Sequence, residues 1–338
     1  MLARQIVLSL SLVLVLVASA DAQERLPCGV VTSTIKLTAS CEGPMVIAAD
    51  NITIDLGGYY VGSEDNDSLI MKDRSGVVIK NGSVGMRGSV LIQGGRNNRL
   101  QDLVLDAPYQ GGGFVLDSQN ARLQRINFFI GTDARGLFIG GKGTAVSEST
   151  FRVACDAVGE VLFLGSEAIA SRNTFFGSAR GNPSLVVGAR ARVEYNTIEW
   201  WPECVNRERP FAAVVLQGNG TVARSNLIRI SGTQGEGYER ISGILAQGSR
   251  SAIKANTIVM SSPEVSSVGI VVSPESSKNI IQKNRISGRD SPDDVGIYVL
   301  GSNSKIVGNN TDSVVNDGTN NVIKRNVVTP FARAKAKR

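Results

Sequence analysis

Two short stretches, ASRNTF at residues 170–175 and VEYNTI at residues 193–198, decide the fold because they repeat one pattern 23 residues apart. In each stretch a small or apolar residue is followed by two variable positions, then Asn, Thr and an apolar residue. The pattern recurs at intervals of 17 to 30 residues, at Asn226, Asn256, Asn284, Asn309 and Asn326. Upstream, the same place in the repeat is assigned to Asn81, Val104, Asn127 and Ser149. The chain is therefore an array of short repeats.

A second motif precedes each Asn by about ten residues and consists of a small residue followed by three apolar ones, as in residues 113–116, 243–246 and 296–299. Each period thus holds three short β-like runs, and none has the 3.6-residue periodicity of an amphipathic helix. One such unit cannot close a core, but stacked units can pair each strand with its counterpart one coil on. The sequence predicts an all-β parallel solenoid of about eleven coils. The recurrent Asn is expected to adopt left-handed turn geometry and to bond along the stack.

The opening segment strengthens this prediction through a resemblance. It contains Cys28, Leu37 and Cys41, followed by ADNITIDLGG at residues 49–58. Together with the repeats, it resembles the right-handed parallel β-helix proteins of the pectin-lyase-like superfamily, of the secreted bacterial type. The resemblance implies a right-handed helix. It implies no single activity, because the superfamily includes lyases, hydrolases, epimerases, maturation factors and non-catalytic members. Similar proteins often have His where this chain has Tyr59.

The composition excludes several kinds of chemistry. The 338 residues include 36 Lys and Arg, 30 Asp and Glu, and no His. A chain without imidazole has no Ser-His-Asp or Cys-His triad and no His-ligated zinc or copper. The Gly-His-Gly and Arg-Ile-Lys signatures of polygalacturonase-like enzymes and the Asp-Pro-His-Asp signature of epimerases are absent. No metal and no cofactor are expected.

The N-terminus has the features of an export signal. Arg4 precedes an apolar run over residues 6–20, and Ala20 and Ala22 are the small residues of a cleavage site. Residues 1–22 are expected to be a signal peptide, residues 23–328 the β-helix, and residues 329–338 a basic tail. The alternative is an uncleaved anchor, but the run is shorter than the roughly 20 residues that span a membrane. The mature protein is expected to be secreted or periplasmic.

Export to an oxidising compartment makes the four cysteines disulfide candidates. Cys28 and Cys41 are close in sequence and could clamp the first coil. Cys155 and Cys204 are expected two coils apart, about 9.6 Å along the stack, so they can pair only if their loops bend inward. A second disulfide between them is predicted on that condition.

The strand after each small residue is apolar on both faces. One face carries Leu91, Val115, Phe138, Val186, Val215, Leu245, Val271 and Tyr298, and the other carries Ile92, Leu116, Ile139, Val187, Leu216, Val272 and Val299. Whichever face is buried, an aliphatic stripe is expected to point outward along the rod. Such a strand is usually covered, here by the long loops folding over it. The alternative is a surface for a protein partner.

The strand that leads into each Asn is rich in Lys and Arg. Over ten coils these segments hold sixteen basic and six acidic residues, including Arg224 and Lys254. Stacking would align them into a basic face that attracts anions. In an exported protein the expected partner is an anionic polysaccharide or cell-envelope glycan, and no nucleic acid is expected. The alternative is a solvated edge that prevents aggregation.

Two insertions follow Asn196 and Asn226, and both tryptophans lie in the first. Aromatic rings beside charged groups suit sugar recognition. The proposed substrate-binding residues are Trp200, Trp201, Arg207, Arg209, Arg224 and Lys254. The candidate catalytic residues for a lyase or glycosidase are Glu203, Glu208, Glu236, Tyr238, Glu239 and Arg240. A surface flap without either role is the alternative for these loops.

The sequence therefore favours an exported β-helix that binds or processes an anionic polysaccharide through the basic face and the 200–240 loops. Two alternatives remain open at this stage. One is a polysaccharide lyase or glycosidase with a site that uses no His. The other is a non-catalytic structural or partner-binding rod.

Overall fold

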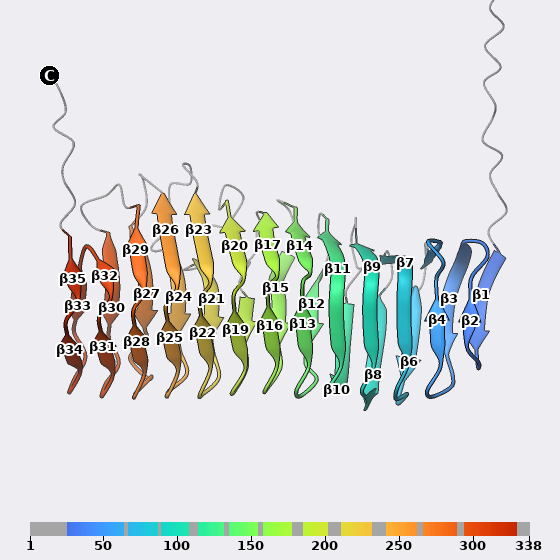
Figure 1. Cartoon of the computed structure of the whole chain (residues 1–338), viewed down its shortest axis with the longest axis horizontal. Coiled ribbons are helices and arrows are strands. Elements are labelled where there is room, and N and C mark those ends of the chain that lie inside the picture. The colour runs from blue at the N-terminus through green and yellow to red at the C-terminus, as the bar shows by residue number, and fades with distance from the viewer. Residues whose placement is uncertain are drawn as a thin grey trace, which may run out of the picture.

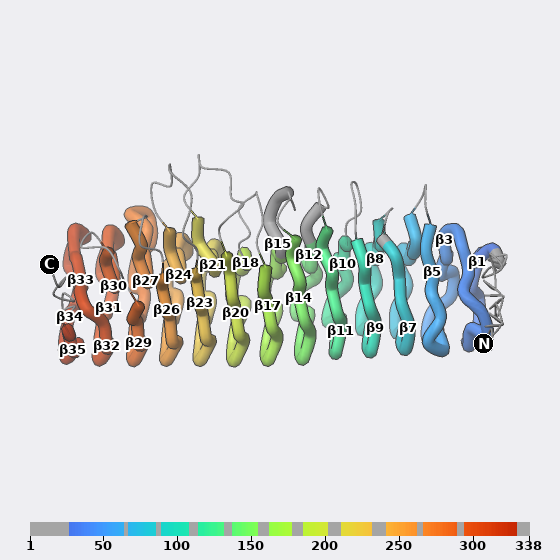
Figure 2. Tube along the Cα trace, turned by 90° about the horizontal axis from the view of Figure 1, so that it is seen from above, coloured from blue at the N-terminus to red at the C-terminus, as the bar shows by residue number. Residues whose placement is uncertain are grey.

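The structure is a computed structural model that describes residues 26–63, 67–86, 89–107, 114–131, 135–154, 158–177, 185–201, 211–231, 241–261, 266–288 and 294–329. Within these ranges every element is a β-strand, and the strands form one parallel sheet that winds into a coil. The chain is a right-handed parallel β-helix, as predicted. Its first and last coils lie at opposite ends of the rod (Figure 1 and Figure 2). The described residues include no helix able to span a membrane. The expected signal peptide lies outside them, as does the tail apart from Thr329.

The strands stack in three rows that run along the rod (Figure 1). Row 1 contains β1 (Leu26–Val31), β3 (Cys41–Ile47), β6 (Leu69–Lys72), β8 (Val90–Arg96), β10 (Phe114–Gln119), β12 (Arg135–Ile139), β15 (Val158–Leu164), β18 (Leu185–Val187), β21 (Phe211–Leu216), β24 (Ile241–Ala246), β27 (Ser267–Val272), β30 (Val295–Val299) and β33 (Val314–Asn316). Row 2 contains β2 (Ile35–Lys36), β4 (Thr53–Asp55), the first halves of β7 (Val78–Met86), β9 (Arg99–Ala107) and β11 (Arg122–Ile130), and then β13 (Ala145–Ser147), β16 (Ile169–Ser171), β19 (Arg192–Glu194), β22 (Val222–Arg224), β25 (Ala252–Lys254), β28 (Ile280–Gln282), β31 (Lys305–Val307) and β34 (Val322–Lys324). Row 3 contains the start of β3, β5 (Tyr60–Ser63), the second halves of β7, β9 and β11, and then β14 (Thr150–Val153), β17 (Thr174–Gly177), β20 (Thr197–Trp200), β23 (Leu227–Ser231), β26 (Thr257–Ser261), β29 (Arg285–Ser287), β32 (Asn310–Thr311) and β35 (Val327–Val328).

The predicted number of about eleven coils is not confirmed. Row 2 links thirteen segments in the described ranges, from β2 to β34. The difference arises at the N-terminal end. The repeat count began at Asn81, whereas β2 and β4 already stack beneath β7.

Each coil buries alternate side chains of its strands in one core that is continuous along the rod. In the three-residue strands of row 2 the middle residue points inward, as Val193, Ala223 and Ile253 do. The centre of the rod also contains a column of stacked rings, with centroid distances of 4.6 Å between Phe128 and Phe151 and 4.5 Å between Phe151 and Phe175. The same alternation points the first and third residues of each row 2 strand outward.

The recurrent asparagines form a buried ladder, as predicted. It runs through Asn173, Asn196, Asn226, Asn256, Asn284, Asn309 and Asn326, with Ser149 before it. The Oδ1 atom of each rung accepts hydrogen bonds from the backbone N–H and the side-chain amide of the rung before it, as from Asn196 to Asn226 at 3.0 Å each. The side-chain amide also donates to a backbone carbonyl of the preceding coil. From Ser149 onward, the ladder therefore ties each coil to its neighbours.

The prediction that the recurrent Asn adopts left-handed geometry is confirmed only at Asn81, where φ is 59°, and is wrong for each ladder Asn. The residue before it does so, with φ between 53° and 59° at Arg125, Glu148, Arg172, Tyr195, Ser225, Ala255, Lys283 and Arg325. A left-handed residue other than Gly costs roughly 1–2 kcal/mol, and the buried ladder bonds offset this cost. The upstream assignments also shift. Ile126 donates its backbone N–H to Ser149, whereas Asn127 and Val104 lie one position later and Asn81 one earlier.

The first coil is closed by a disulfide between Cys28 and Cys41, as predicted, with the Cα atoms 4.9 Å apart. Cys155 and Cys204 lie outside the described residues. Their bridge stays a prediction.

Candidate anion-binding face

The outer face of row 2 gathers charged side chains at four positions of each coil. Two are the first and third residues of the strand, which point away from the core. The other two are the left-handed residues that flank the strand, such as Arg190 before β19 and Tyr195 after it. Because coils of a parallel stack are about 4.8 Å apart, equivalent side chains lie within reach of one another. The charge of this face therefore depends on which residues meet across neighbouring coils.

Between β4 and β22, ion pairs hold part of the charge of this face. Arg125 donates to Asp102 at 2.6 Å and lies 3.7 Å from Glu148. Glu167 and Glu194 each join two cations, at distances of 2.5 Å to Arg190, 3.4 Å to Lys142, 2.8 Å to Arg192 and 3.5 Å to Arg224. Lys80 lies 3.8 Å from Asp55. Six basic residues of these coils are thus matched by acids one coil away or two residues away, whereas Arg99, Arg122 and Arg172 form no ion pair with the described residues.

The titration of two carboxyl groups reflects this pairing. The hydrogen bond from Arg125 lowers the pKa of Asp102 below its usual value and raises that of Arg125. Partial burial alone would raise the pKa of Glu167, but Arg190 and Lys142 together lower it. Both carboxylates are therefore charged and engaged at neutral pH.

Beyond β22 the acids disappear from this face while the cations continue. The strands β25, β28, β31 and β34 and their flanking turn residues, over 250–255, 278–283, 303–308 and 320–325, contain no Asp or Glu. They carry seven cations, here called the C-terminal basic strip: Arg250, Lys254, Lys278, Lys283, Lys305, Lys324 and Arg325. Within the described part of the chain none of the seven forms an ion pair. The predicted basic face is therefore concentrated in the last coils.

Arg224 and Lys254 were predicted to share one site, and the structure places them opposite each other in adjacent strands. Their environments differ. Arg224 lies near Glu194 and donates to the hydroxyl of Tyr195 at 3.1 Å, with its guanidinium 5.4 Å from that ring's centroid. Lys254 has no acidic neighbour. Arg224 thus marks the boundary of the strip, and Lys254 belongs to it.

The two tryptophans predicted to bind sugar lie in different environments, one buried and one exposed. Trp200, at the end of β20, is 1% exposed, so its ring offers no face to a sugar, which corrects the expectation for this residue. Its neighbour Trp201 is 39% exposed. The reason is the row 3 alternation, which points residue 200 inward. The other predicted loop residues lie outside the described ranges: Glu203, Arg207, Glu208, Arg209, Glu236, Tyr238, Glu239 and Arg240.

Of the two apolar faces of row 1, the one with Val115 and Phe138 points outward and the one with Leu116 and Ile139 is buried, but the outward stripe is not uniform. Val186, Val215 and Val271 are buried, and the first two belong to a second apolar cluster with Ala212. Toward the N-terminus, Phe138 is 41% exposed and stacks on Phe163 at 5.0 Å. The stripe is therefore covered in the middle of the rod and open before it.

The sequence matches no protein-family profile and no curated protein. Among solved structures, the chain is similar to the surface protein and adhesin PfbA of Streptococcus pneumoniae, with 10% identity, coverage of 90% of each chain and a TM-score of 0.43. It is similar to the alginate lyase AlyF-OU02, solved in complex with G6, with 13% identity, coverage of 88% and 81%, and a TM-score of 0.43. It is also similar to the A-module of the Azotobacter vinelandii mannuronan C-5 epimerase AlgE6, with 9% identity, coverage of 89% and 92%, and a TM-score of 0.38. At these identities, the function has to be argued from the chain's own residues.

Proposed function

We propose that this β-helix binds an anionic polysaccharide through the C-terminal basic strip. The observation that carries the proposal is the grouping of seven unpaired cations on four adjacent coils without an acid among them. A surface of one sign concentrates counter-charged ligands and orients them before contact. Its Lys and Arg side chains are long enough to adapt to carboxylates or sulfates.

The spacing of the strip supports a linear polyanion. Each of the four coils provides one or two cations, and the coils follow one another every 4.8 Å or so. A chain laid along the rod would therefore meet a new cation at each coil. A compact anion would use only two or three of them.

The expected compartment supports a glycan over a nucleic acid. The Cys28–Cys41 disulfide is in keeping with an oxidising environment, and the N-terminal sequence has the features of an export signal. The anions available to an exported protein are acidic polysaccharides and envelope glycans. Trp201, with Arg207 and Arg209, would add sugar contacts from the 200–240 loops.

The test is retention of the mature protein on immobilised alginate and pectate, with neutral dextran as the control polymer. The double variant Lys254→Glu/Lys278→Glu reverses two charges of the strip. The matched control Lys36→Glu/Lys72→Glu reverses two exposed lysines near the other end of the rod. Exposed charge contacts are worth about 0.2–1 kcal/mol each, and reversal adds repulsion, so the strip variant should bind roughly tenfold more weakly.

Salt provides a second readout for the same proposal. The distance over which charges attract, the Debye length, shortens from about 10 Å at 0.1 M salt to about 3 Å at 1 M. Because salt weakens the attraction, the wild type should elute from the immobilised polysaccharide as the salt concentration rises. Retention that resists salt, or an equal loss in both double variants, would refute binding through the strip.

The enzyme alternative is tested on the same polymers by the appearance of unsaturated uronides and new reducing ends. Its candidate residues are those of the 200–240 loops, beginning with Glu203 and Tyr238. Turnover that survives the strip variant and is lost in Tyr238→Phe would favour a lyase in these loops. The non-catalytic rod is favoured if neither turnover nor retention is observed.

A further inference from the structure

At the C-terminal end of the rod, no described residue covers the cross-section of the β-helix. The last coil, formed by β33, β34 and β35, pairs with the coil before it and with nothing described beyond it. Ile323 occupies the inward column of Ile306 and Ile281, which are fully buried, yet it is 40% exposed. Val327 is 60% exposed. Core side chains and strand edges thus face outward together at this end.

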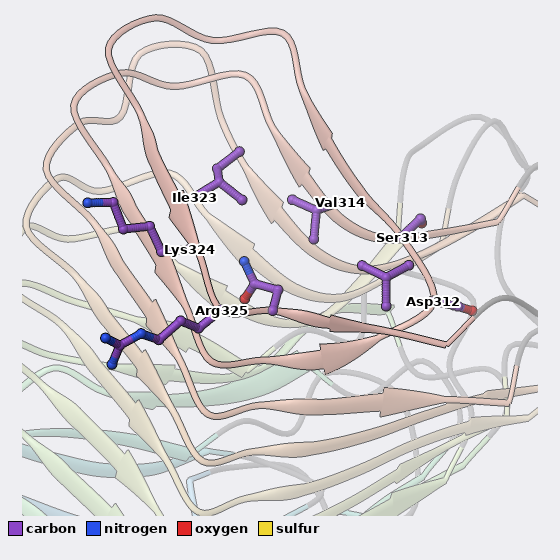
Figure 3. A pocket seen from close by; sticks show the side chains of 8 residues that line it. Asp312, Ser313, Val314, Ile323, Lys324 and Arg325 are labelled. Carbon is purple, nitrogen blue, oxygen red and sulfur yellow. The ribbon is translucent and has the colours of Figure 1, made fainter.

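The end surface also contains a shallow hollow of about 510 Å³. Figure 3 shows Val314 and Ile323 inside the turn of the last coil, with Lys324 and Arg325 directed away from it. The hollow therefore has apolar side chains inside the coil and a positively charged rim at Lys324 and Arg325, while Asp312 lines another part of it. Lys324 and Arg325 belong to the C-terminal basic strip, so the positive charge continues to the end of the rod.

The asparagine ladder and a second ladder of side-chain hydrogen bonds both end at this coil. In each of them, the last residue has a backbone N–H that lacks, among the described residues, the acceptor found in earlier coils. Asn326 accepts two hydrogen bonds from Asn309 at 2.9 Å. In the second ladder, at the turn before row 2, Asn321 accepts from the backbone of Ser304 at 2.7 Å. In earlier coils the equivalent backbone N–H donates to a side-chain oxygen of the next coil, as Asn284 does to Asn309. Among the described residues, the N–H groups of Asn321 and Asn326 have no such acceptor.

We propose that this end docks an extended acidic segment of a protein partner, which adds to the rod as its next coil. The segment would pair with the edges of β34 and β35, in the manner of a strand added to a sheet. An Asn or Asp side chain over Asn326 would continue the ladder, and an acidic residue would meet Lys324.

A second copy of this chain is disfavoured by charge. A tail-to-tail pair would bring Lys324 and Arg325 of both copies to one interface. A head-to-tail stack would place Lys36 over Lys324, since the two occupy the same column of row 2. Like charges directly opposite each other in a sheet are destabilising. The complementary partner therefore carries negative charge.

The probe for this proposal is a labelled synthetic peptide with the sequence of residues 302–312 and two changes, Lys305→Glu and Val307→Glu. In register with the last coil, residue 307 of the peptide would lie over Lys324 and residue 309 over Asn326. Two control peptides isolate the two contributions. One adds Asn309→Ala to the acidic peptide, and the other keeps Lys305 and has Val307→Lys.

Binding to the mature protein is followed by fluorescence anisotropy. The acidic peptide should bind, its Asn309→Ala form should bind about tenfold more weakly, and the basic peptide should not bind. The protein variant Lys324→Glu should reverse the preference between acidic and basic peptides. Lys36→Glu, a lysine at the opposite end, should change nothing.

Two outcomes overturn the proposal. The first is absent binding, or equal binding of all three peptides. The second is sedimentation showing that the wild type already dimerises through this end and that Lys324→Glu alters the dimer. The variant Lys254→Glu/Lys278→Glu should leave peptide binding unchanged, which separates this surface from polysaccharide binding.

Discussion

Removing one rung of the asparagine ladder should cost far more stability inside the rod than at its end. Asn226 is buried and makes four side-chain hydrogen bonds. It donates to the carbonyl of Val193 at 2.8 Å and to Asn256 at 2.9 Å. It accepts from the backbone and the side-chain amide of Asn196 at 3.0 Å each. The substitution Asn226→Ala deletes all four bonds and leaves no route for water to replace them.

The magnitude follows from the groups left behind. Three buried groups lose their partner: two N–H donors of Asn196 and the carbonyl of Val193. A buried polar group without a partner costs about 1–3 kcal/mol, so the loss of three partners should lower the free energy of unfolding by at least about 3 kcal/mol. That is a large part of the roughly 5–15 kcal/mol by which a folded protein is stable.

Asn326→Ala is the matched control, because it removes the last rung at the open end. Asn326 is half-buried there, so water can reach the groups that it leaves. The expected loss is about 1 kcal/mol. Both variants are compared by urea unfolding followed by circular dichroism, with similar denaturant slopes required for the comparison. Losses that agree within about 0.5 kcal/mol would refute the claim that burial gives the ladder its strength.

Further predictions concern the cap, the core, and the effect of pH. Cys28→Ser should lower stability by about 3 kcal/mol, because it frees a short loop that the bond to Cys41 closes. Phe151→Ala interrupts the ring column and should cost about 3–5 kcal/mol in the same unfolding assay. Arg125 lowers the pKa of Asp102, so this pair stabilises the fold above the unfolded pKa of about 3.9 and stops doing so as pH falls through the folded pKa. Arg125→Gln should therefore raise the Asp102 pKa in an NMR titration. Polysaccharide retention should stay constant from about pH 5 to 8, because His, the side chain that ordinarily titrates there, is absent.

Much of the fold could be predicted from the sequence because stacking imposes a strict repeat. Asn173 and Asn196 occupy the same position of repeats that begin 23 residues apart. A polar residue repeated in this way in a β-rich unit is best explained by a ladder of side chains along the stack. The left-handed position was harder to find. It is occupied by Arg172, Tyr195 and Ser225 in successive coils, and none of these carries the Gly or Asn signal by which such turns are recognised.

The location of the basic strip could be predicted only in part. A count of charges along the sequence finds an excess of Lys and Arg, but it cannot show which of them meet an acid. That depends on register. Glu167 neutralises Arg190 because stacking brings residues 23 positions apart together. Trp200 shows the same limit, since one position along β20 separates a buried ring from the exposed Trp201.

One column of row 2 illustrates the change in charge along the rod. This column consists of the third residue of each row 2 strand, which in β19 is Glu194. The carboxylate of Glu194 forms ion pairs with Arg192 in its own strand and with Arg224 in the next strand, β22. In the following coils the same position holds Lys254 and Gln282. Because this column has no acid beyond β22, no carboxylate in it offsets the positive charge of the Lys and Arg side chains on neighbouring coils. The loss of acids from a few repeated positions thus changes a sheet face of mixed charge into one that carries only cations, while the ladder beside it continues unchanged.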